Sequence, residues 1–188
     1  MTILFSLISL FLTLSCNNTA NKNETKLISS ADTMNKKNSF EAYTADYIQI
    51  RQLIDEYNDL VNLRRWESID DIFTNDAVWE AASPVNMKWT GLDDIKVKLP
   101  ASAERMEVLI QSSSGVIINV ENPISATARS LLTEFGRNKE TSQGMHSVAT
   151  YEDVLVKVKG KWRIKSRKLT LLYNDTLPVP GNIKDYKY

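Results

Sequence analysis

Cysteine and histidine are almost absent from this sequence: its 188 residues include one of each, Cys16 and His146. A single cysteine cannot form a disulfide within the chain, so the stability of the fold must come from its core. One histidine with no cysteine partners also argues against a structural zinc site. No metal is therefore predicted, and His146 is the obvious candidate for a general base.

The sequence also lacks an excess of charge of either sign. Lys and Arg together number 23, as do Asp and Glu, so the formal net charge is zero. This balance predicts neither a nucleic-acid partner nor a basic membrane-binding surface. A glycine-rich phosphate loop, a Gly-x-Ser-x-Gly motif and a dinucleotide-binding fingerprint are missing as well, so we expect no cofactor. The hydrophobic fraction of 43% is ample for one folded domain with extensions.

Long apolar runs are absent beyond the N-terminus, where residues 3–14 form one of signal-peptide length, too short for a membrane span. Ser15 and Cys16 follow, and a small residue before a lone cysteine resembles the lipobox of bacterial lipoproteins, whose cysteine is acylated. Thr13 departs from this pattern, which usually has Leu there. We expect residues 1–16 to be a signal peptide and Cys16 to anchor the protein in a bacterial cell envelope. An ordinary cleaved signal, giving a secreted or periplasmic soluble protein, is the alternative.

The segments at either end of the predicted domain are poor in residues that could form a core. Residues 17–43 are rich in Asn, Lys, Ser and Thr, and predict a flexible tether. Residues 175–188 contain Pro178 and Pro180 and predict an extended or disordered tail. The folded domain is therefore expected over residues 44–174.

The first half of this domain has the pattern of helices. Apolar residues recur at helical spacing from residue 50 to residue 61, with Thr44 or Asp46 as the candidate N-cap. A second short helix is predicted over residues 66–73, followed by a turn at Asn75-Asp76 and a strand over 77–80. A further helix is predicted to start at Gly91, to run to about Leu99 and to end at Pro100.

The second half has the two-residue period of strands. Candidate strands cover residues 106–121, 124–135, 145–159 and 161–173. The last two predict a hairpin with a three-residue loop around Gly160, which would place Val158 opposite Trp162 on an apolar face. The same register pairs Asp153 with Arg167 on the other face as a structural ion pair. Helices followed by an antiparallel meander predict the α+β class.

Three segments resemble SnoaL-like domains of the nuclear transport factor 2-like superfamily. They are IRQLIDEYNDLVNLRRWESIDDIFTNDAVWE, with its helix Tyr and Phe-Thr-x-Asp-Ala turn; GLDDI, a helix start; and ATYEDVLVKVKGKWRIKSRKL, with Tyr-x-Asp and Trp-Arg-Ile. They span about residues 44–173. The resemblance implies a cone in which N-terminal helices pack in a strongly curved, mixed and mainly antiparallel sheet around a pocket.

The resemblance also implies where a catalytic dyad would lie. Relatives similar to scytalone dehydratase and to polyketide cyclases use a pocket Asp and His as general acid and base. The Asp corresponds to Asn62 and the His falls near Gln111 in this sequence. Asn and Gln form hydrogen bonds but do not titrate near neutral pH. Standard Asp/His dyad chemistry is therefore not expected.

Other residues offer proton transfer or an apolar wall. His146, Glu80 and Glu134 are weak catalytic candidates, since each is also an ordinary strand residue, and a carboxyl buried among aromatic groups would gain a raised pKa. Aromatic and amide side chains are the expected ligand contacts. These are Tyr57, Asn62, Trp79, Trp89 and Gln111.

Three functions remain open on this basis. The first is an exported pocket protein that binds a small apolar or amphipathic molecule. The second is a dehydratase, isomerase or cyclase that uses His146 or a buried Glu. The third is a module for dimerisation or partner binding through the sheet. The identity of the small molecule is not encoded in any pattern of the sequence.

Overall fold

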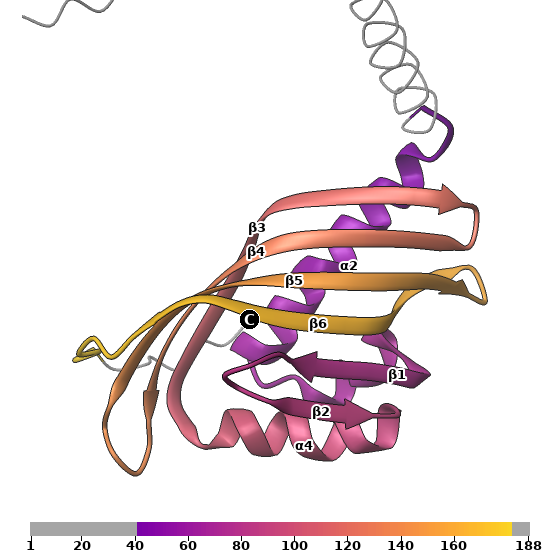
Figure 1. Ribbon diagram of the computed structural model, residues 1–188. Coiled ribbons are helices and arrows are strands. Elements are labelled where there is room, and N and C mark those ends of the chain that lie inside the picture. The colour runs from indigo at the N-terminus through magenta and orange to yellow at the C-terminus, as the bar shows by residue number, and fades with distance from the viewer. Residues whose placement is uncertain (1–40, 182–188) are drawn as a thin grey trace, which may run out of the picture. The chain divides into compact units, whose positions relative to one another are not determined.

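The computed structural model describes residues 41–181 (Figure 1). The expected signal peptide with Cys16, and the tether up to residue 40, lie outside these residues. The helices of the described part are α2 (Thr44–Asn62), the 3-10 helix η1 (Trp66–Ser68), α3 (Ile69–Ile72) and α4 (Leu92–Glu104). Its strands are β1 (Phe73–Ala81), β2 (Met87–Thr90), β3 (Met106–Asn122), β4 (Ser125–Asn138), β5 (Gly144–Val158) and β6 (Lys161–Asp175).

The strands form one six-stranded sheet in the order β2-β1-β6-β5-β4-β3. The β1 and β6 strands are parallel, whereas the other neighbouring pairs are antiparallel. Figure 1 shows the long strands β3 to β6 bending around α2, with α4 close to β1 and β2. The predicted α+β class and the mixed, mainly antiparallel, curved sheet are confirmed.

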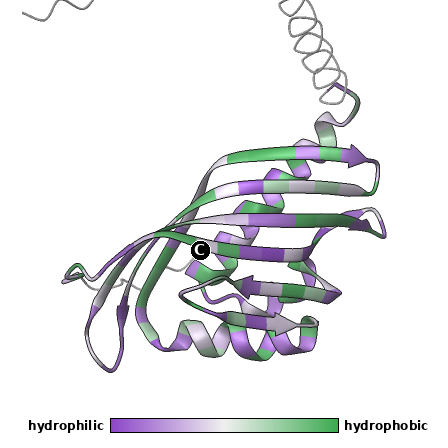
Figure 2. Ribbon diagram, in the orientation of Figure 1, coloured by the Kyte–Doolittle hydropathy of each residue, from purple (hydrophilic) through white to green (hydrophobic). Residues whose placement is uncertain are grey.

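Helix α2 supplies the centre of the core. Its buried apolar residues are those of the predicted stripe, and they are Ile50, Leu53, Ile54, Tyr57, Leu60 and Val61. The long strands contain both hydrophobic and hydrophilic residues (Figure 2), and buried positions recur at every second residue over much of β4 and β5, so that one face of the sheet packs on this helix. Within residues 41–181, no helix combines the length and the apolar character needed to cross a membrane.

The N-cap prediction for α2 is wrong. Tyr43 occupies the N-cap position, and no side chain caps the helix there. Asp46 lies inside the first turn, where its carboxylate accepts a hydrogen bond of 2.9 Å from the indole nitrogen of Trp162 and forms an ion pair with Lys157. These charge-assisted contacts with the β5–β6 hairpin occupy the carboxylate that would otherwise cap the helix.

Two predicted interruptions are also absent. The predicted turn at Asn75-Asp76 lies within the continuous strand β1, whose pairing with β6 shifts register between Phe73 and Val78. Helix α4 continues through Pro100 as far as Glu104. Proline removes one backbone donor from a helix, but Leu99 and Ala103 are buried on either side of it. Packing of these residues on the core holds the helix together across Pro100.

The β5–β6 hairpin has a shorter loop than predicted. Lys159 and Gly160 form a two-residue turn with φ of 50° and 81°, which places Val158 opposite Lys161 instead of Trp162. Positive φ at both positions is typical of a hairpin turn that matches the twist of the strands. The register then shifts between Val154 and Leu155, which restores the predicted pairing of residues further along both strands.

The extra residue at this register shift is Lys165 of β6, so the buried face changes in β6 and stays the same in β5. Val154 and Val158 are 44% and 45% exposed, whereas Leu155 is fully buried opposite Ile164. The prediction of an inward Val158 is therefore wrong, because the shorter loop places Lys157, and not Val158, opposite the buried Trp162. Asp153 shares the buried face of β5 with Leu155, and the extra residue in β6 turns Arg167 to the same side.

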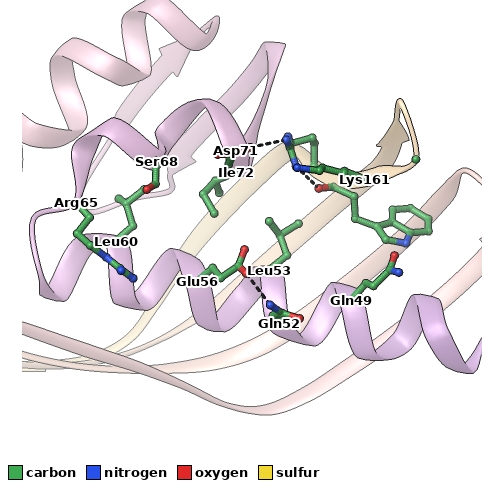
Figure 3. A pocket seen from close by; sticks show the side chains of 13 residues that line it. Gln49, Gln52, Leu53, Glu56, Leu60, Arg65, Ser68, Asp71, Ile72 and Lys161 are labelled. Carbon is green, nitrogen blue, oxygen red and sulfur yellow. Dashed lines mark hydrogen bonds and ion pairs between the residues drawn. The ribbon is translucent and has the colours of Figure 1, made fainter. Parts of the chain in front are cut away.

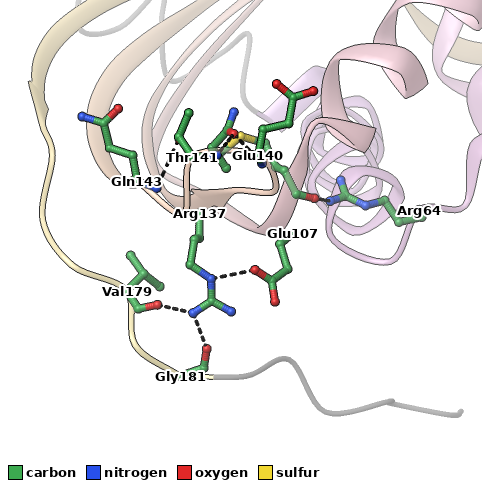
Figure 4. Close-up of polar contacts among 10 residues, drawn as sticks. Arg64, Glu107, Arg137, Glu140, Thr141, Gln143, Val179 and Gly181 are labelled. Atoms are coloured by element: carbon green, nitrogen blue, oxygen red, sulfur yellow. Dashed lines mark hydrogen bonds and ion pairs between the residues drawn. The ribbon is translucent and has the colours of Figure 1, made fainter.

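The described end of the chain is extended and held in place. Residues 176–181 have no regular secondary structure. The guanidinium of Arg137 donates hydrogen bonds to the carbonyl oxygens of Val179 and Gly181 and binds Glu107 at 2.9 Å (Figure 4). Gly144 lies so close to this segment that an added Cβ would be 1.7 Å from the carbonyl oxygen of Leu177.

Candidate functional site

A cavity of about 510 Å³ lies between α2, the C-terminal half of α4 and the inner face of the sheet. Most of its lining is apolar or aromatic, which suits a small organic ligand. Leu99 and Ala103 of α4 contribute to one side, and Leu132, Ala149 and Leu169 of the long strands contribute to the other. The curvature of the sheet brings these elements around one space.

An aromatic wall forms part of the cavity. Trp79 of β1 lies directly opposite Trp89 of β2, and their rings stack with centroids 4.2 Å apart and an interplanar angle of 17°. The indole nitrogen of Trp79 donates a hydrogen bond of 3.3 Å to the hydroxyl of Tyr57. All three residues line the cavity. The structure therefore brings the predicted aromatic contacts together on one side of the space.

Behind this wall lies the pair formed by Asp153 and Arg167. Two hydrogen bonds of 2.8 Å join the side chains, which are both fully buried. The predicted partnership is present, but the prediction that it lies on the face opposite the apolar residues is wrong, because the extra residue in β6 turns Arg167 to the buried face that Asp153 shares. The Arg167 guanidinium lies 4.1 Å from the ring centroid of Tyr57 and 4.3 Å from that of Tyr151.

Electrostatics favour a charged Arg167 in this position. Burial acts to lower the pKa of Arg167, but the charge of Asp153 and its hydrogen bonds outweigh burial and raise it. Burial raises the pKa of the Tyr57 and Tyr151 hydroxyls. The tyrosines therefore stay neutral and act as hydrogen-bonding and cation-binding rings.

Glu134 is the carboxyl group of the cavity. It lies on β4 and lines the space, and burial raises its pKa from 4.5 to about 7. It has no hydrogen bond or ion pair with another residue of the described chain. A carboxyl group in this environment exists in both protonation states near neutral pH, and can therefore accept or donate a proton.

The two amides at the expected dyad positions have different surroundings. The side chain of Asn62 binds the backbone of Gln111 through two hydrogen bonds of 2.8 Å, one to its carbonyl oxygen and one from its N–H. Asn62 does not line the cavity, so the structure gives it the role of a clamp between α2 and β3. The Gln111 side chain is 3% exposed, lines the cavity and has no partner for its Nε2.

The other catalytic candidates lie away from the cavity. His146 is on the opposite face of β5 from Met145 and Ser147, which do line it, and its ring lies near that of Tyr173 at a centroid distance of 6.3 Å. Glu80 forms an ion pair of 3.7 Å with Lys88. Neither residue is placed to act on a molecule in the cavity.

A second hollow lies between α2, α3 and the β5–β6 hairpin (Figure 3). Its volume of about 580 Å³ exceeds that of the cavity, and it includes Leu53 and Trp162. Exposed polar residues dominate its rim, and some of them already pair, as Arg163 does with Asp71 at 2.9 Å. It contains no buried side-chain atom that lacks a partner. We therefore place the candidate site in the apolar cavity.

Within residues 41–181, no group of three or more His, Cys, Asp or Glu side chains is placed to hold a metal ion. Sequence reasoning missed the clamp role of Asn62 and the inward position of Arg167. Asn62 contacts a strand that is distant along the chain, and the position of Arg167 depends on the extra residue in β6, so a pattern within one segment indicates neither.

Comparison with solved structures shows the same fold in several proteins. A scytalone dehydratase-like protein from Novosphingobium aromaticivorans is 19% identical with a TM-score of 0.66, over 78% of this chain and 99% of that one. A hexachlorocyclohexane dehydrochlorinase from Novosphingobium barchaimii is 15% identical with a TM-score of 0.65, over 76% and 97%. A protein from Kribbella flavida is 20% identical with a TM-score of 0.65, over 70% and 94%.

At these identities the likeness establishes the fold and not the activity. The search of curated proteins found no match. The sequence itself, however, matches the SnoaL-like domain over residues 42–168, which is most of the described chain. This match, together with the shared fold, means that the chain belongs to the family of SnoaL-like domains.

Proposed function

We propose that the cavity binds a small apolar or amphipathic molecule, without standard Asp/His dyad chemistry. The observation that carries this proposal is the lining: stacked Trp79 and Trp89, aliphatic side chains, and the amide of Gln111 at one of the two expected dyad positions. Asn62 is fully engaged with the backbone of Gln111. Neither amide can transfer a proton near neutral pH, and His146 lies on the other face of β5.

Fluorescence titration with N-phenyl-1-naphthylamine, a neutral aromatic probe, tests this proposal. Ser102 of α4 lines the cavity, so Ser102→Trp should fill part of the space and abolish most of the probe binding. Val97 of the same helix is 69% exposed and lies outside the cavity. Val97→Trp is therefore the matched control and should bind like the wild type. Equal binding by the wild type and Ser102→Trp would refute binding in this cavity.

An enzyme of the dehydratase, isomerase or cyclase type is the second candidate. It is favoured by Glu134, whose pKa of about 7 is suited to a general base or acid. The reaction class would be proton abstraction next to a carbonyl group, with the proton taken up by the Glu134 carboxylate. Deuterium exchange from solvent into the methyl group of acetophenone, followed by mass spectrometry, tests it. Exchange no faster than with Glu134→Gln would exclude this role.

Dimerisation or partner binding through the sheet is the third candidate. Phe135 and Tyr173 are 42% and 50% exposed, and they lie opposite His146 and Val148 of β5 respectively. Exposed aromatic side chains of this kind favour a contact with another protein. Light scattering would measure the oligomeric state of the wild type and of the double variant Phe135→Ser with Tyr173→Ser. A wild type that is monomeric at high concentration would exclude the homodimer.

Export and lipid anchoring complete the proposal. The apolar run over residues 3–14 and the following Ser15-Cys16 support a lipoprotein signal, which would place the cavity in the bacterial cell envelope. Cells labelled with radioactive palmitate should yield labelled wild-type protein and unlabelled Cys16→Ala protein. Absence of label from the wild type would exclude the anchor and leave the secreted or periplasmic form.

A further inference from the structure

Four polar side chains form a row across the wall of the apolar cavity. In the strand register, Gln111 on β3 lies opposite Glu134 on β4, Glu134 lies opposite Ser147 on β5, and Ser147 lies opposite Asn174 on β6. All four line the cavity. Residues directly opposite each other share a face of the sheet, and neighbouring strands lie about 4.8 Å apart, so the row is about 14 Å long. We call these four residues the polar row.

The two ends of the polar row differ in how their hydrogen bonds are satisfied. At the outer end, the hydroxyl of Ser147 donates a hydrogen bond of 2.7 Å to the amide oxygen of Asn174. At the inner end, Gln111 is 3% exposed and its Nε2 has no partner. Glu134, next to it, has no hydrogen bond or ion pair with other described residues. The half-buried Glu134 is therefore adjacent to the buried, unpartnered amide of Gln111.

Nearby polar groups show that the fold does satisfy buried groups elsewhere on β3. The hydroxyl of Ser113 donates to the amide oxygen of Asn58 at 3.1 Å. A buried amide left without a partner costs about 1–3 kcal/mol. The two other unpartnered buried atoms of the described chain belong to Ser130 and Arg167, which do not line the cavity. Gln111 is thus a lining residue of the cavity whose buried donor has no partner in the described chain.

We propose, on the basis of the proposed ligand binding, that Gln111 and Glu134 together hold the polar end of the ligand. That end is a neutral hydrogen-bond acceptor, the carbonyl oxygen of a ketone, ester or lactone. The Gln111 amide and the protonated Glu134 carboxyl each donate one hydrogen bond to it. The apolar body of the ligand then contacts the stacked rings of Trp79 and Trp89. No proton is transferred to the ligand in this step.

The protonation of Glu134 controls this interaction. Burial already raises its pKa to about 7, and a neutral ligand that displaces water favours the uncharged carboxyl further. The other titratable residues of the lining are Tyr57, Arg105 and Tyr151, and Arg167 lies behind the tyrosine rings. The tyrosine pKa values are raised, so both hydroxyls stay neutral between pH 6 and 8.

Affinity for a carbonyl ligand should therefore follow the protonated fraction of Glu134. A ligand that binds one of two forms has its apparent affinity reduced in proportion to the population of that form. For a group that titrates near pH 7, the protonated fraction falls about tenfold between pH 6 and pH 8. The affinity of a carbonyl ligand should fall by the same factor.

Two fluorescent probes test the inference. Prodan is a neutral naphthyl ketone, whereas N-phenyl-1-naphthylamine has no carbonyl group. We expect wild-type protein to bind Prodan about tenfold more weakly at pH 8 than at pH 6, with little change for the naphthylamine. Glu134→Gln, which donates at both pH values, should bind Prodan at pH 8 about as well as the wild type does at pH 6. Glu152→Gln, at an exposed position of β5, is the matched control.

The role of the amide has its own variant. Gln111→Leu keeps an apolar side chain of similar size and should weaken Prodan binding up to about tenfold at pH 6. It should leave naphthylamine binding intact, which also shows that the variant is folded. Loss of Prodan binding by Glu134→Gln at both pH values, with naphthylamine binding retained, would overturn the inference. A Prodan affinity that is unaffected by pH and by Gln111→Leu would overturn the inference as well.

The outcomes separate this inference from the proposed function. Wild-type protein that binds the naphthylamine but shows none of the Prodan effects refutes the role of the polar row and leaves apolar ligand binding in place. Wild-type protein that binds neither probe refutes both proposals together. Circular dichroism of each variant verifies that the comparison is made on folded protein.

Discussion

Asp153 and Arg167 form an ion pair that is fully shielded from solvent and held by two hydrogen bonds of 2.8 Å. The pair joins neighbouring strands β5 and β6, and the guanidinium also packs on the ring of Tyr57 from α2. A charge-paired centre therefore links the sheet to the helix. Because solvent does not reach the pair, removal of either partner alone would leave the other as an unpaired buried charge.

Removal of one member of this pair should destabilise the protein strongly. We expect Arg167→Met to lower the free energy of unfolding by about 3–5 kcal/mol, because Asp153 is left charged and unpaired. The double variant Asp153→Leu with Arg167→Met should lose much less than the sum of the single variants. Urea unfolding followed by circular dichroism measures each value. Additive losses in the double variant would contradict the argument.

The clamp formed by Asn62 should stabilise the fold without contributing to ligand affinity. Asn62→Ala removes both hydrogen bonds to the backbone of Gln111 and leaves the N–H and carbonyl groups of Gln111 unpaired. We expect a loss of about 1–3 kcal/mol in the free energy of unfolding. Probe binding by the folded variant should stay within about twofold of the wild type, since Asn62 does not line the cavity. A stable variant with impaired binding would show that Asn62 contacts the ligand.

Glu134 should make the stability depend on pH. Its folded-state pKa is raised from 4.5 to about 7, so between these values the folded state retains a proton that the unfolded state has released. The contribution of Glu134 to stability is therefore fully present below about pH 4.5 and is lost as pH rises through about 7. The loss amounts to at most about 3 kcal/mol. Glu134→Gln should remove it.

Denaturant unfolding at pH 5 and pH 8 measures this contribution as a difference between the wild type and the variant. Glu134→Gln should be the more stable of the two at pH 8, and its advantage should be smaller at pH 5. Glu152→Gln, on the same sheet but exposed, should show no such dependence. An equal pH dependence in the wild type and Glu134→Gln would mean that the carboxyl is solvated.

The extended segment after β6 should be released by a single methyl group. Gly144→Ala would place a Cβ 1.7 Å from the carbonyl oxygen of Leu177, so the segment must move away. We expect faster hydrogen exchange and proteolysis over residues 176–181. Gly181→Ala is the matched control, because open space surrounds that position. Unchanged exchange in Gly144→Ala would show that β5 adjusts instead.

Much of the fold follows from patterns within single segments. The apolar stripe of α2 and the alternation of the four long strands predict these elements, because a helix face or a strand face must be buried along its whole length. Errors arose where one residue changes the alternation. The extra residue Lys165 reverses the faces of β6, and Pro100 is tolerated because its neighbours are anchored in the core.

The site was predictable in part for the same reason. Tyr57, Trp79, Trp89 and Gln111 line the cavity as their types and positions suggested. Whether Glu134 or His146 faces inward depends on the register of β4 and β5, which alternation alone did not determine. The role of Asn62 depends on a contact 49 residues away along the chain, so no local pattern could indicate it.

The clamp of Asn62 also limits how this domain could change over evolution. An acidic residue at this position would lack the amide N–H that donates a hydrogen bond to the carbonyl oxygen of Gln111. Its carboxylate would instead point at that oxygen. A single substitution toward a catalytic dyad would therefore first loosen the joint between α2 and β3. New chemistry in this domain would be easier to gain from Glu134, whose environment already raises its pKa, than by replacement of Asn62.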